Sequence, residues 1–432
     1  MTSERAVQVT PERGWVFATR SLYGDILLST GGRLVAAALT FAKTVLLVRL
    51  LEPSVYGVVA VVLSWGYIAS GVGELGCGAA FILLESSSVQ AQQIAHFWSF
   101  LRSRLLVSAV LGALWGAAAT TGLVAVAGIS GPALLFGLGQ NICHAPEFLF
   151  QAQRRFTRYS RFLVGVGVLQ LLWSIAALAL YRQWQLGQQA LWILLALAPW
   201  FAAVATLLPL AMSQWRLVKP SFKADWAYLR TMVAFGKWVA AGGLLAYVFQ
   251  RWAVITLGRT GNPHAAGAYD VAVTCAQAVN LLTLAVVSAL SPRFAGSHDQ
   301  ALARRGLVRL LKRGGPIVAA VLALYYLLRG QLITALFGPE YGASTAALDA
   351  LMPSFLLSLL TQPMVAYTTF GLRAPQVVCW AAMGCTALLM LAAGAITRSF
   401  GVTGLALLQS VLLIVEHLVI TLYALYGPRA GA

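Results

Sequence analysis

Four basic side chains lie inside long apolar stretches of the sequence, where a charge is costly. Arg33 and Lys43 fall in the first such stretch, and Lys237 and Arg251 fall in the seventh. A buried ionisable group in a membrane span costs several kcal/mol unless it is paired or hydrated, so it indicates function by default. Lys237 and Arg251 also share a helix face, because their spacing is close to a whole number of turns.

The chemistry that these cations predict is the binding of an anionic group. Arg and Lys in a low-dielectric cleft form charge-assisted hydrogen bonds with phosphate or carboxylate oxygens. We therefore expect Arg33, Lys43, Lys237 and Arg251 to line a cavity. The alternative is that Lys43 and Lys237, which lie near the ends of their stretches, reach out to lipid headgroups.

Two polar stripes follow helical spacing along other apolar stretches. They comprise Gln140, His144, Glu147 and Gln151 in one stretch, and Asp270, Thr274 and Gln277 in another. Each set falls on one helix face, which must contact protein or water. The stripes could line a pathway for a polar substrate or form hydrogen bonds between helices. Glu74 and Asp270 could carry a coupling H⁺ or Na⁺, or could pair with the cations.

The sequence lacks the common catalytic and nucleotide-binding motifs. It has no GxxxxGK(S/T) phosphate loop, no GxSxG nucleophile motif, and no His, Cys or Glu cluster with metal-ligand spacing. The five cysteines fall singly in apolar stretches without CxxC spacing, as small buried side chains do: Cys77, Cys143, Cys275, Cys379 and Cys385. We therefore expect no enzyme, no metal centre and no cofactor.

The elements that hold these residues are predicted by composition. The chain has 432 residues, of which 59% are hydrophobic and 10% charged, whereas soluble domains carry about 25% charged residues. Several stretches of 18 or more residues are almost free of charge, and that length crosses about 30 Å of hydrocarbon. The sequence predicts an all-α polytopic membrane protein with spans at roughly 22–48, 55–84, 103–127, 132–153, 161–181, 189–213, 232–257, 266–290, 314–335, 345–370, 374–396 and 401–426.

The distribution of basic residues predicts the orientation. Basic clusters occupy alternate connections, as the positive-inside rule requires, and the other connections hold only Arg49, Arg182, Arg259, Arg329 and Arg398. Both termini are therefore expected in the cytoplasm, and the protein in the cell inner membrane. The net charge of +17 has the same explanation and does not indicate nucleic-acid binding.

A weak internal repeat divides the chain into halves. Pro53 and Tyr56-Gly57 after the first span correspond to Pro263 and Gly267-Ala268-Tyr269 after the seventh. Pro146 and Pro363 interrupt the corresponding fourth and tenth spans, either along a substrate path or as packing kinks. Six spans per half predict a parallel repeat, with two pseudo-symmetric six-helix bundles, 1–215 and 216–432, around a central cavity.

Short motifs in both halves resemble the Wzx-type flippases of the multidrug/oligosaccharidyl-lipid/polysaccharide (MOP) exporter superfamily, in its polysaccharide-transporter branch. The motifs are Arg49-Leu50-Leu51-Glu52-Pro53-Ser54-Val55-Tyr56-Gly57, Glu74-Leu75-Gly76, Gly267-Ala268-Tyr269-Asp270-Val271-Ala272, Phe337-Gly338-Pro339-Glu340-Tyr341 and Gly401-Val402-Thr403-Gly404-Leu405-Ala406. One departure is Gln250-Arg251, because these flippases often carry an acidic residue before this arginine. A coupling carboxylate at position 250 is therefore not expected.

The resemblance implies a function for the cations. Such flippases move an undecaprenyl-diphosphate-linked oligosaccharide, a unit of O-antigen, capsule or exopolysaccharide, from the cytoplasmic to the outer leaflet by alternating access. The cations would then hold the diphosphate or acidic sugars of this polyprenyl-diphosphate-linked glycan. The partners implied are this lipid, the bilayer, and polysaccharide polymerase or assembly proteins.

Three other functions fit the residues less well than flipping of a glycan lipid. A multidrug or cation antiporter of the same superfamily should have an acidic cavity, whereas the deep charges here are mostly basic. A membrane polysaccharide polymerase should carry a large extracytoplasmic loop, and the predicted outer connections are short. A lipid II flippase of the MurJ type should have fourteen spans, and the sequence predicts twelve.

Overall fold

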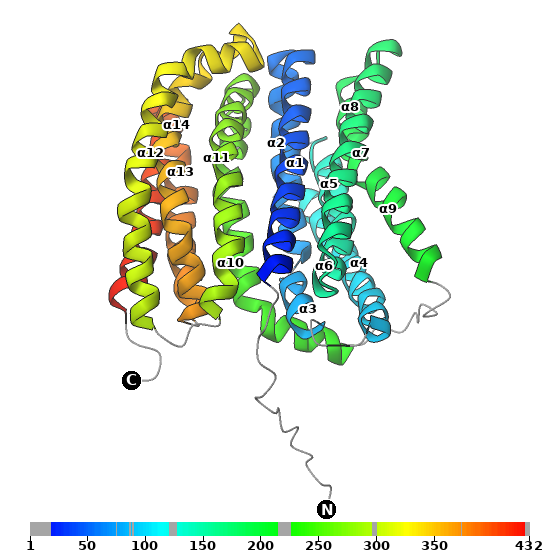
Figure 1. Cartoon of the computed structure of the whole chain (residues 1–432). Helices are drawn as coiled ribbons and strands as arrows, with labels where there is room; N and C mark the ends of the chain where they lie inside the picture. Colours follow the sequence, from blue (N-terminus) through cyan, green and yellow to red (C-terminus); the bar gives the residue numbers. More distant parts are fainter. Residues whose placement is uncertain are drawn as a thin grey trace, which may run out of the picture.

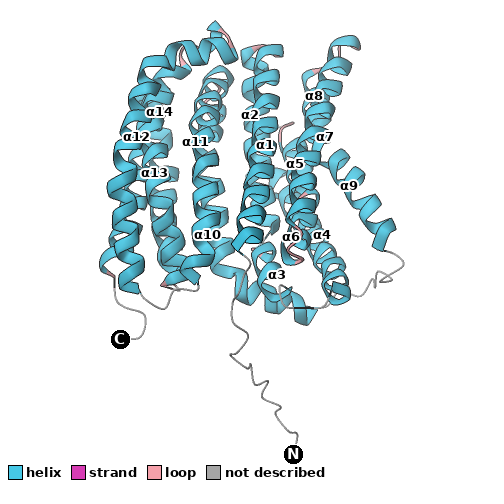
Figure 2. Ribbon diagram, in the orientation of Figure 1, coloured by secondary structure: helices cyan, strands magenta, loops and turns pink. Residues whose placement is uncertain are grey.

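The structure is a computed structural model that describes residues 19–74, 76–85, 88, 90–120, 128–214, 226–295, 300–372 and 374–427. This part of the chain forms a bundle of α-helices without a strand (Figures 1 and 2). The helices are α1 (Thr19–Leu50), α2 (Pro53–Glu74), α3 (Cys77–Glu85), α4 (Gln90–Thr120), α5 (Ser130–Cys143), α6 (Ala145–Ala152), α7 (Phe156–Gln183), α8 (Gln188–Ala196), α9 (Ala198–Gln214), α10 (Trp226–Arg259), α11 (Pro263–Ala295), α12 (Gln300–Phe337), α13 (Ser344–Ala366) and α14 (Pro375–Tyr426).

Each predicted span coincides, over its described residues, with one helix or with consecutive helices; residues 121–127 of the span predicted at 103–127 lie outside the described part of the chain. The pairs α2–α3, α5–α6 and α8–α9 each cover one predicted span, and α14 covers the last two. By length and composition, seven described helices could cross a membrane, or eight if a bent pair within α12 counts as one span. This number counts α14 as one helix, although α14 contains two of the predicted spans. The predicted class, an all-α polytopic membrane protein, is confirmed.

α14 is two helices joined at Gly401. Its 52 residues would extend about 78 Å if they were straight, more than twice the hydrocarbon thickness. Gly401 interrupts the helix with φ 64° and ψ −153°, a combination that only glycine adopts without strain. The break falls where the sequence predicts that the last two spans meet.

The two prolines that were predicted to interrupt corresponding spans act differently. Pro146 lies in the first turn of α6, directly after the break between α5 and α6 at His144. Pro363 lies inside α13, and the helix continues to Ala366 before it widens into a π-helical turn at Tyr367–Gly371. A proline removes one backbone donor from the series of i→i−4 hydrogen bonds, and a π-helical turn is one way for a helix to accommodate that loss.

The helices run between two ends of the bundle. The start of α1 and the end of α14 lie at the same end, here named the terminal end, and the α1–α2 and α10–α11 turns lie at the opposite end (Figure 1). The predicted boundary between the halves, at residue 215, falls in residues 215–225, outside the described part of the chain. The division into two six-helix bundles stays a prediction.

Helices from before and after this boundary touch closely at the opposite end. α2 packs against both α10 and α11, and α1 packs against α11. At the crossing of α2 and α11, a Cβ atom on Gly57 would lie only 1.7 Å from the carbonyl oxygen of Pro263. Gly57 is therefore required for this approach, and the packed core runs through it from Val55 and Val59 to Ala266 and Tyr269.

Candidate functional site

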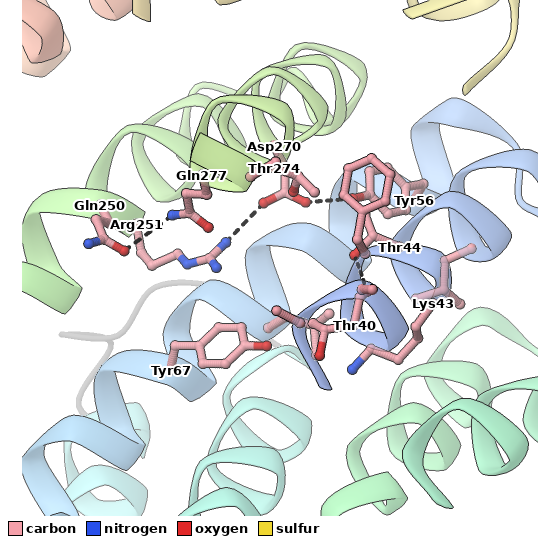
Figure 3. Close-up of a pocket in the computed structure, with 16 residues that line it drawn as sticks. Thr40, Lys43, Thr44, Tyr56, Tyr67, Gln250, Arg251, Asp270, Thr274 and Gln277 are labelled. Atoms are coloured by element: carbon pink, nitrogen blue, oxygen red, sulfur yellow. Dashed lines mark hydrogen bonds and ion pairs between the residues drawn. The ribbon is translucent and has the colours of Figure 1, made fainter. Parts of the chain in front are cut away.

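A cavity of about 540 Å³ lies between α1, α2, α10 and α11, the helices that meet across the two halves of the chain. Figure 3 shows interactions among its polar lining residues, which link Gln250 to Gln277 and Asp270 to both Arg251 and Tyr56. The lining comprises Ala37, Ala38, Thr40, Phe41, Lys43, Thr44, Leu47, Tyr56, Leu63, Tyr67, Gln250, Arg251, Asp270, Thr274, Gln277 and Ala278. Three of the predicted site residues, Lys43, Arg251 and Asp270, therefore share one cavity.

The α10–α11 hairpin places Arg251 opposite Asp270. Arg251 lies about two turns before the end of α10, and Asp270 about two turns after the start of α11. The two antiparallel helices are joined by a short turn, so the side chains meet at the same depth. Arg251 Nη1 lies 3.1 Å from Asp270 Oδ1, and the pair is largely shielded from solvent.

Asp270 also joins the two halves of the chain. The hydroxyl of Tyr56, on α2, donates a hydrogen bond to Asp270 Oδ2 (Figure 3). The guanidinium of Arg251 lies over the ring of Tyr67, also on α2, with Cζ 4.6 Å from the ring centroid. Two α2 aromatic residues thus hold the ion pair from the first half of the chain, which orients the guanidinium beside the cavity.

The amide side chains next to the ion pair form a second link between α10 and α11. Gln277 Nε2 donates a hydrogen bond of 3.2 Å to Gln250 Oε1, and both side chains line the cavity. Gln277 belongs to the predicted Asp270–Thr274–Gln277 stripe, all of which lines the cavity. The stripe therefore lines the cavity and forms a hydrogen bond to a neighbouring helix, and its role in a pathway for a polar substrate stays a prediction.

Lys43 is the second cation of the cavity and lies on α1. The residue is 6% exposed, and Nζ lies 3.5 Å from Gln170 Oε1 on α7. Among the described residues, no carboxylate lies within ion-pair distance of Nζ, in contrast to Arg251. Lys43 thus brings a positive charge to the cavity that no described acidic side chain neutralises.

The other two predicted cations lie elsewhere. Arg33 Nε donates to the hydroxyl of Tyr159 on α7, so this arginine joins α1 to α7 outside the lining of the cavity. Lys237 is exposed on α10 and is also absent from the lining. The structure thus brings together one cation from each half.

The remaining predicted site residues lie in the first half. Glu74 Oε1 is 3.9 Å from a guanidinium nitrogen of Arg104, a buried side chain stacked between Phe100 and Phe148. His144 Nδ1 is 3.2 Å from Glu147 Oε2, on either side of the start of α6. None of these residues lines the 540 Å³ cavity. The polar stripe through His144 and Glu147 crosses the α5–α6 break.

Sequence reasoning missed several polar residues near the cavities. Tyr56 belonged to a quoted motif, but its pairing with Asp270 depends on the other half of the chain. A second cavity, of about 100 Å³, lies among α10, α13 and α14 and is lined by Glu416 and His417. His417 Nδ1 lies 2.9 Å from the hydroxyl of Thr361. The sequence could have indicated this second cavity, because Glu416 is an acidic residue inside the last predicted span.

The fold defines a class of protein, the polytopic all-α membrane proteins, here with a polar cavity between helices of the two halves of the chain. A family model described as "Polysaccharide biosynthesis protein" matches residues 46–346, which is most of the chain. The chain therefore belongs to this polysaccharide biosynthesis protein family. No curated protein matches the chain in a sequence comparison.

Solved structures with a similar fold include two MATE transporters and a lipid II flippase. The MATE multidrug transporter DinF-BH has a TM-score of 0.64 at 16% identity, covering 97% of this chain and 98% of that one. The eukaryotic MATE transporter AtDTX14 has a TM-score of 0.62 at 17% identity, covering 94% and 95%. The lipid II flippase MurJ, in an inward closed conformation, has a TM-score of 0.58 at 10% identity, covering 92% and 87%. These likenesses establish the fold.

Proposed function

We propose that this protein carries an undecaprenyl-diphosphate-linked oligosaccharide from the cytoplasmic to the outer leaflet of the cell inner membrane. The observation that supports this most is the pair of cations, Lys43 and Arg251, that face one cavity between the halves of the chain. A diphosphate carries dense negative charge, and two cations that line one low-dielectric cleft are suited to hold it. The polysaccharide biosynthesis family supports a glycan as the cargo.

The contacts around the cavity are compatible with alternating access. Toward the opposite end, the rings of Tyr56 and Tyr341 meet edge to face with centroids 6.2 Å apart, and Phe41 meets Phe337 in the same way at 5.9 Å. Each pair joins the two halves of the chain. Separation of these aromatic contacts would open the cavity to the opposite end, which we propose is the outer leaflet.

A transport assay tests this function directly. The full chain is reconstituted in liposomes, and the transbilayer movement of a fluorescent polyprenyl-diphosphate oligosaccharide is followed for wild type and for Lys43→Gln. We expect Lys43→Gln to slow transport by at least about tenfold, because it removes the unneutralised cation and one charge-assisted contact is worth about 1.5–3 kcal/mol.

Lys237→Gln is the matched control, because it removes a cation that is exposed and outside the cavity. It should transport at close to the wild-type rate. Equal losses in both variants would mean that total charge matters and not the cavity. Export of a cationic dye with no movement of any diphosphate lipid would replace this function by multidrug transport, the activity that the name of the similar structure DinF-BH gives.

Coupling to a gradient of H⁺ or Na⁺ is part of the proposal. Two membrane carboxylates, Asp270 and Glu416, line cavities, whereas Glu74 lies beside Arg104. We expect Asp270→Asn or Glu416→Gln to remove the response of transport to an imposed gradient, and Glu74→Gln to leave it. A gradient response that persists in both cavity variants would exclude coupling at these carboxylates.

A further inference from the structure

We infer that a basic groove between α12 and α14 binds the headgroup of an anionic phospholipid. The groove has a volume of about 440 Å³ and lies on different helices from the 540 Å³ cavity. Arg304, Arg305, Val308, Arg309 and Lys312 of α12 line it together with Leu425 and Tyr426 of α14. Every charged side chain of this lining is a cation.

The cations of the groove converge because of their spacing. Arg305, Arg309 and Lys312 follow i, i+4, i+7 positions, so they share one face of α12. All three side chains are exposed, and no described carboxylate lies within ion-pair distance of any of them. The positive-inside rule accounts for basic residues near a membrane surface, but it does not require them to line one concave site on two helices.

The fourth cation fixes the two walls of the groove to each other. Arg304 Nη2 donates a hydrogen bond of 3.0 Å to the carbonyl oxygen of Gly427, the residue that follows α14. Arg304 Nε is buried and has no hydrogen-bond partner in the described part of the chain. Arg304 thus holds α12 against the end of α14 and contributes its charge to the lining of the groove.

The other lining residues select a lipid over a soluble anion. Tyr426 is 80% exposed and Val308 is 36% exposed, so an apolar edge borders the cations. Further along α12, Ile317, Leu324 and Leu327 expose large apolar side chains, as a helix that faces acyl chains does. α12 also forms the outer edge of the bundle (Figure 1). A headgroup at the cations would thus place its acyl chains along the exposed apolar side of α12.

The test compares two double variants of the full chain, one in the groove and one outside it. Arg309→Gln with Lys312→Gln removes two exposed cations of the groove. Arg158→Gln with Arg161→Gln removes two exposed cations with the same i, i+3 spacing on α7. Neither pair is buried, so both variants should fold, and both lower the net charge equally. Binding of phosphatidylglycerol to the purified protein is measured by native mass spectrometry, with phosphatidylcholine as the neutral reference.

We expect the groove variant to bind phosphatidylglycerol about tenfold more weakly than wild type, and the α7 variant to match wild type. An equal loss in both variants, or none in the groove variant, would overturn the proposal. Added inorganic diphosphate and undecaprenyl diphosphate then distinguish the occupant. If either compound binds the groove more tightly than phosphatidylglycerol and displaces it, the site belongs to that compound and not to a bilayer phospholipid. This result is independent of the transport assay.

Discussion

Arg251 and Asp270 form an ion pair across the α10–α11 hairpin, with 3.1 Å between Nη1 and Oδ1, at the wall of the central cavity. Tyr56 and Tyr67 of α2 contact the acid and the base respectively. The pair therefore connects the second half of the chain to the first through the same side chains that line the cavity.

Removal of one member of this pair should cost more stability than removal of both. Asp270→Asn leaves the Arg251 charge unpaired in a largely buried position, and we expect a loss of about 2–4 kcal/mol in the free energy of unfolding. Adding Arg251→Gln should restore about 1–3 kcal/mol of that loss. A double-mutant cycle from unfolding in detergent measures this coupling. Purely additive losses would contradict an energetic link between the two side chains.

Gly57→Ala should disturb the contact between the halves at the opposite end. The added methyl group would meet the carbonyl oxygen of Pro263, a backbone atom that cannot move alone, so α2 and α11 must separate. We expect thermal destabilisation and a larger distance between spin labels on α2 and α11. Gly31→Ala is the control, because nothing lies within 4 Å of its added Cβ and alanine favours the helix by about 0.5–1 kcal/mol. Similar behaviour of the two variants would argue against this close approach.

Tyr228→Phe should weaken a contact at the terminal end. The Tyr228 hydroxyl, on α10, donates a hydrogen bond of 2.7 Å to Glu85 Oε1 on α3, and His96 stacks on its ring. Because Glu85 is buried, we expect a loss of about 1–2 kcal/mol for this contact, with stacking preserved. The measurement is the rate at which a cysteine placed on α3 beside α10 reacts with a soluble reagent. An unchanged rate would mean that this hydrogen bond does not hold the two helices together.

Gly401→Ala should destabilise the junction within α14. The φ of 64° with ψ of −153° lies in a region that a side chain makes unfavourable, at a cost of about 1–3 kcal/mol. Gly384→Ala in the same helix meets no atom within 4 Å and should be neutral or slightly stabilising. Unfolding temperatures of the two variants give the comparison. If Gly401→Ala is as stable as Gly384→Ala, then the last two spans do not require this turn.

Much of the fold could be predicted from the sequence, because a bilayer restricts what an apolar segment can do. A spanning segment must satisfy its backbone hydrogen bonds internally, so long apolar stretches become helices. The apolar stretches predicted the positions of α7 and α13 in the chain. Gly401 lies where the last two spans were predicted to meet. The break at Pro146 followed from the missing donor of proline. The π-helical turn at Tyr367–Gly371 beyond Pro363 is compatible with the same missing donor, but the sequence did not predict where it lies.

The sequence by itself determined the helices, the membrane class of the protein and the position of each charged residue along its helix. Only the tertiary structure decided which charges meet. Spacing in the sequence sets the position along a helix, but the rotation of that helix about its axis is set by packing against its neighbours. Lys43 and Arg251 therefore share a cavity, whereas Arg33 turns to Tyr159 and Lys237 faces outward. The sequence offered Asp270 as a possible partner of the cations, but its pairing with Arg251 required α10 and α11 to fold back on each other.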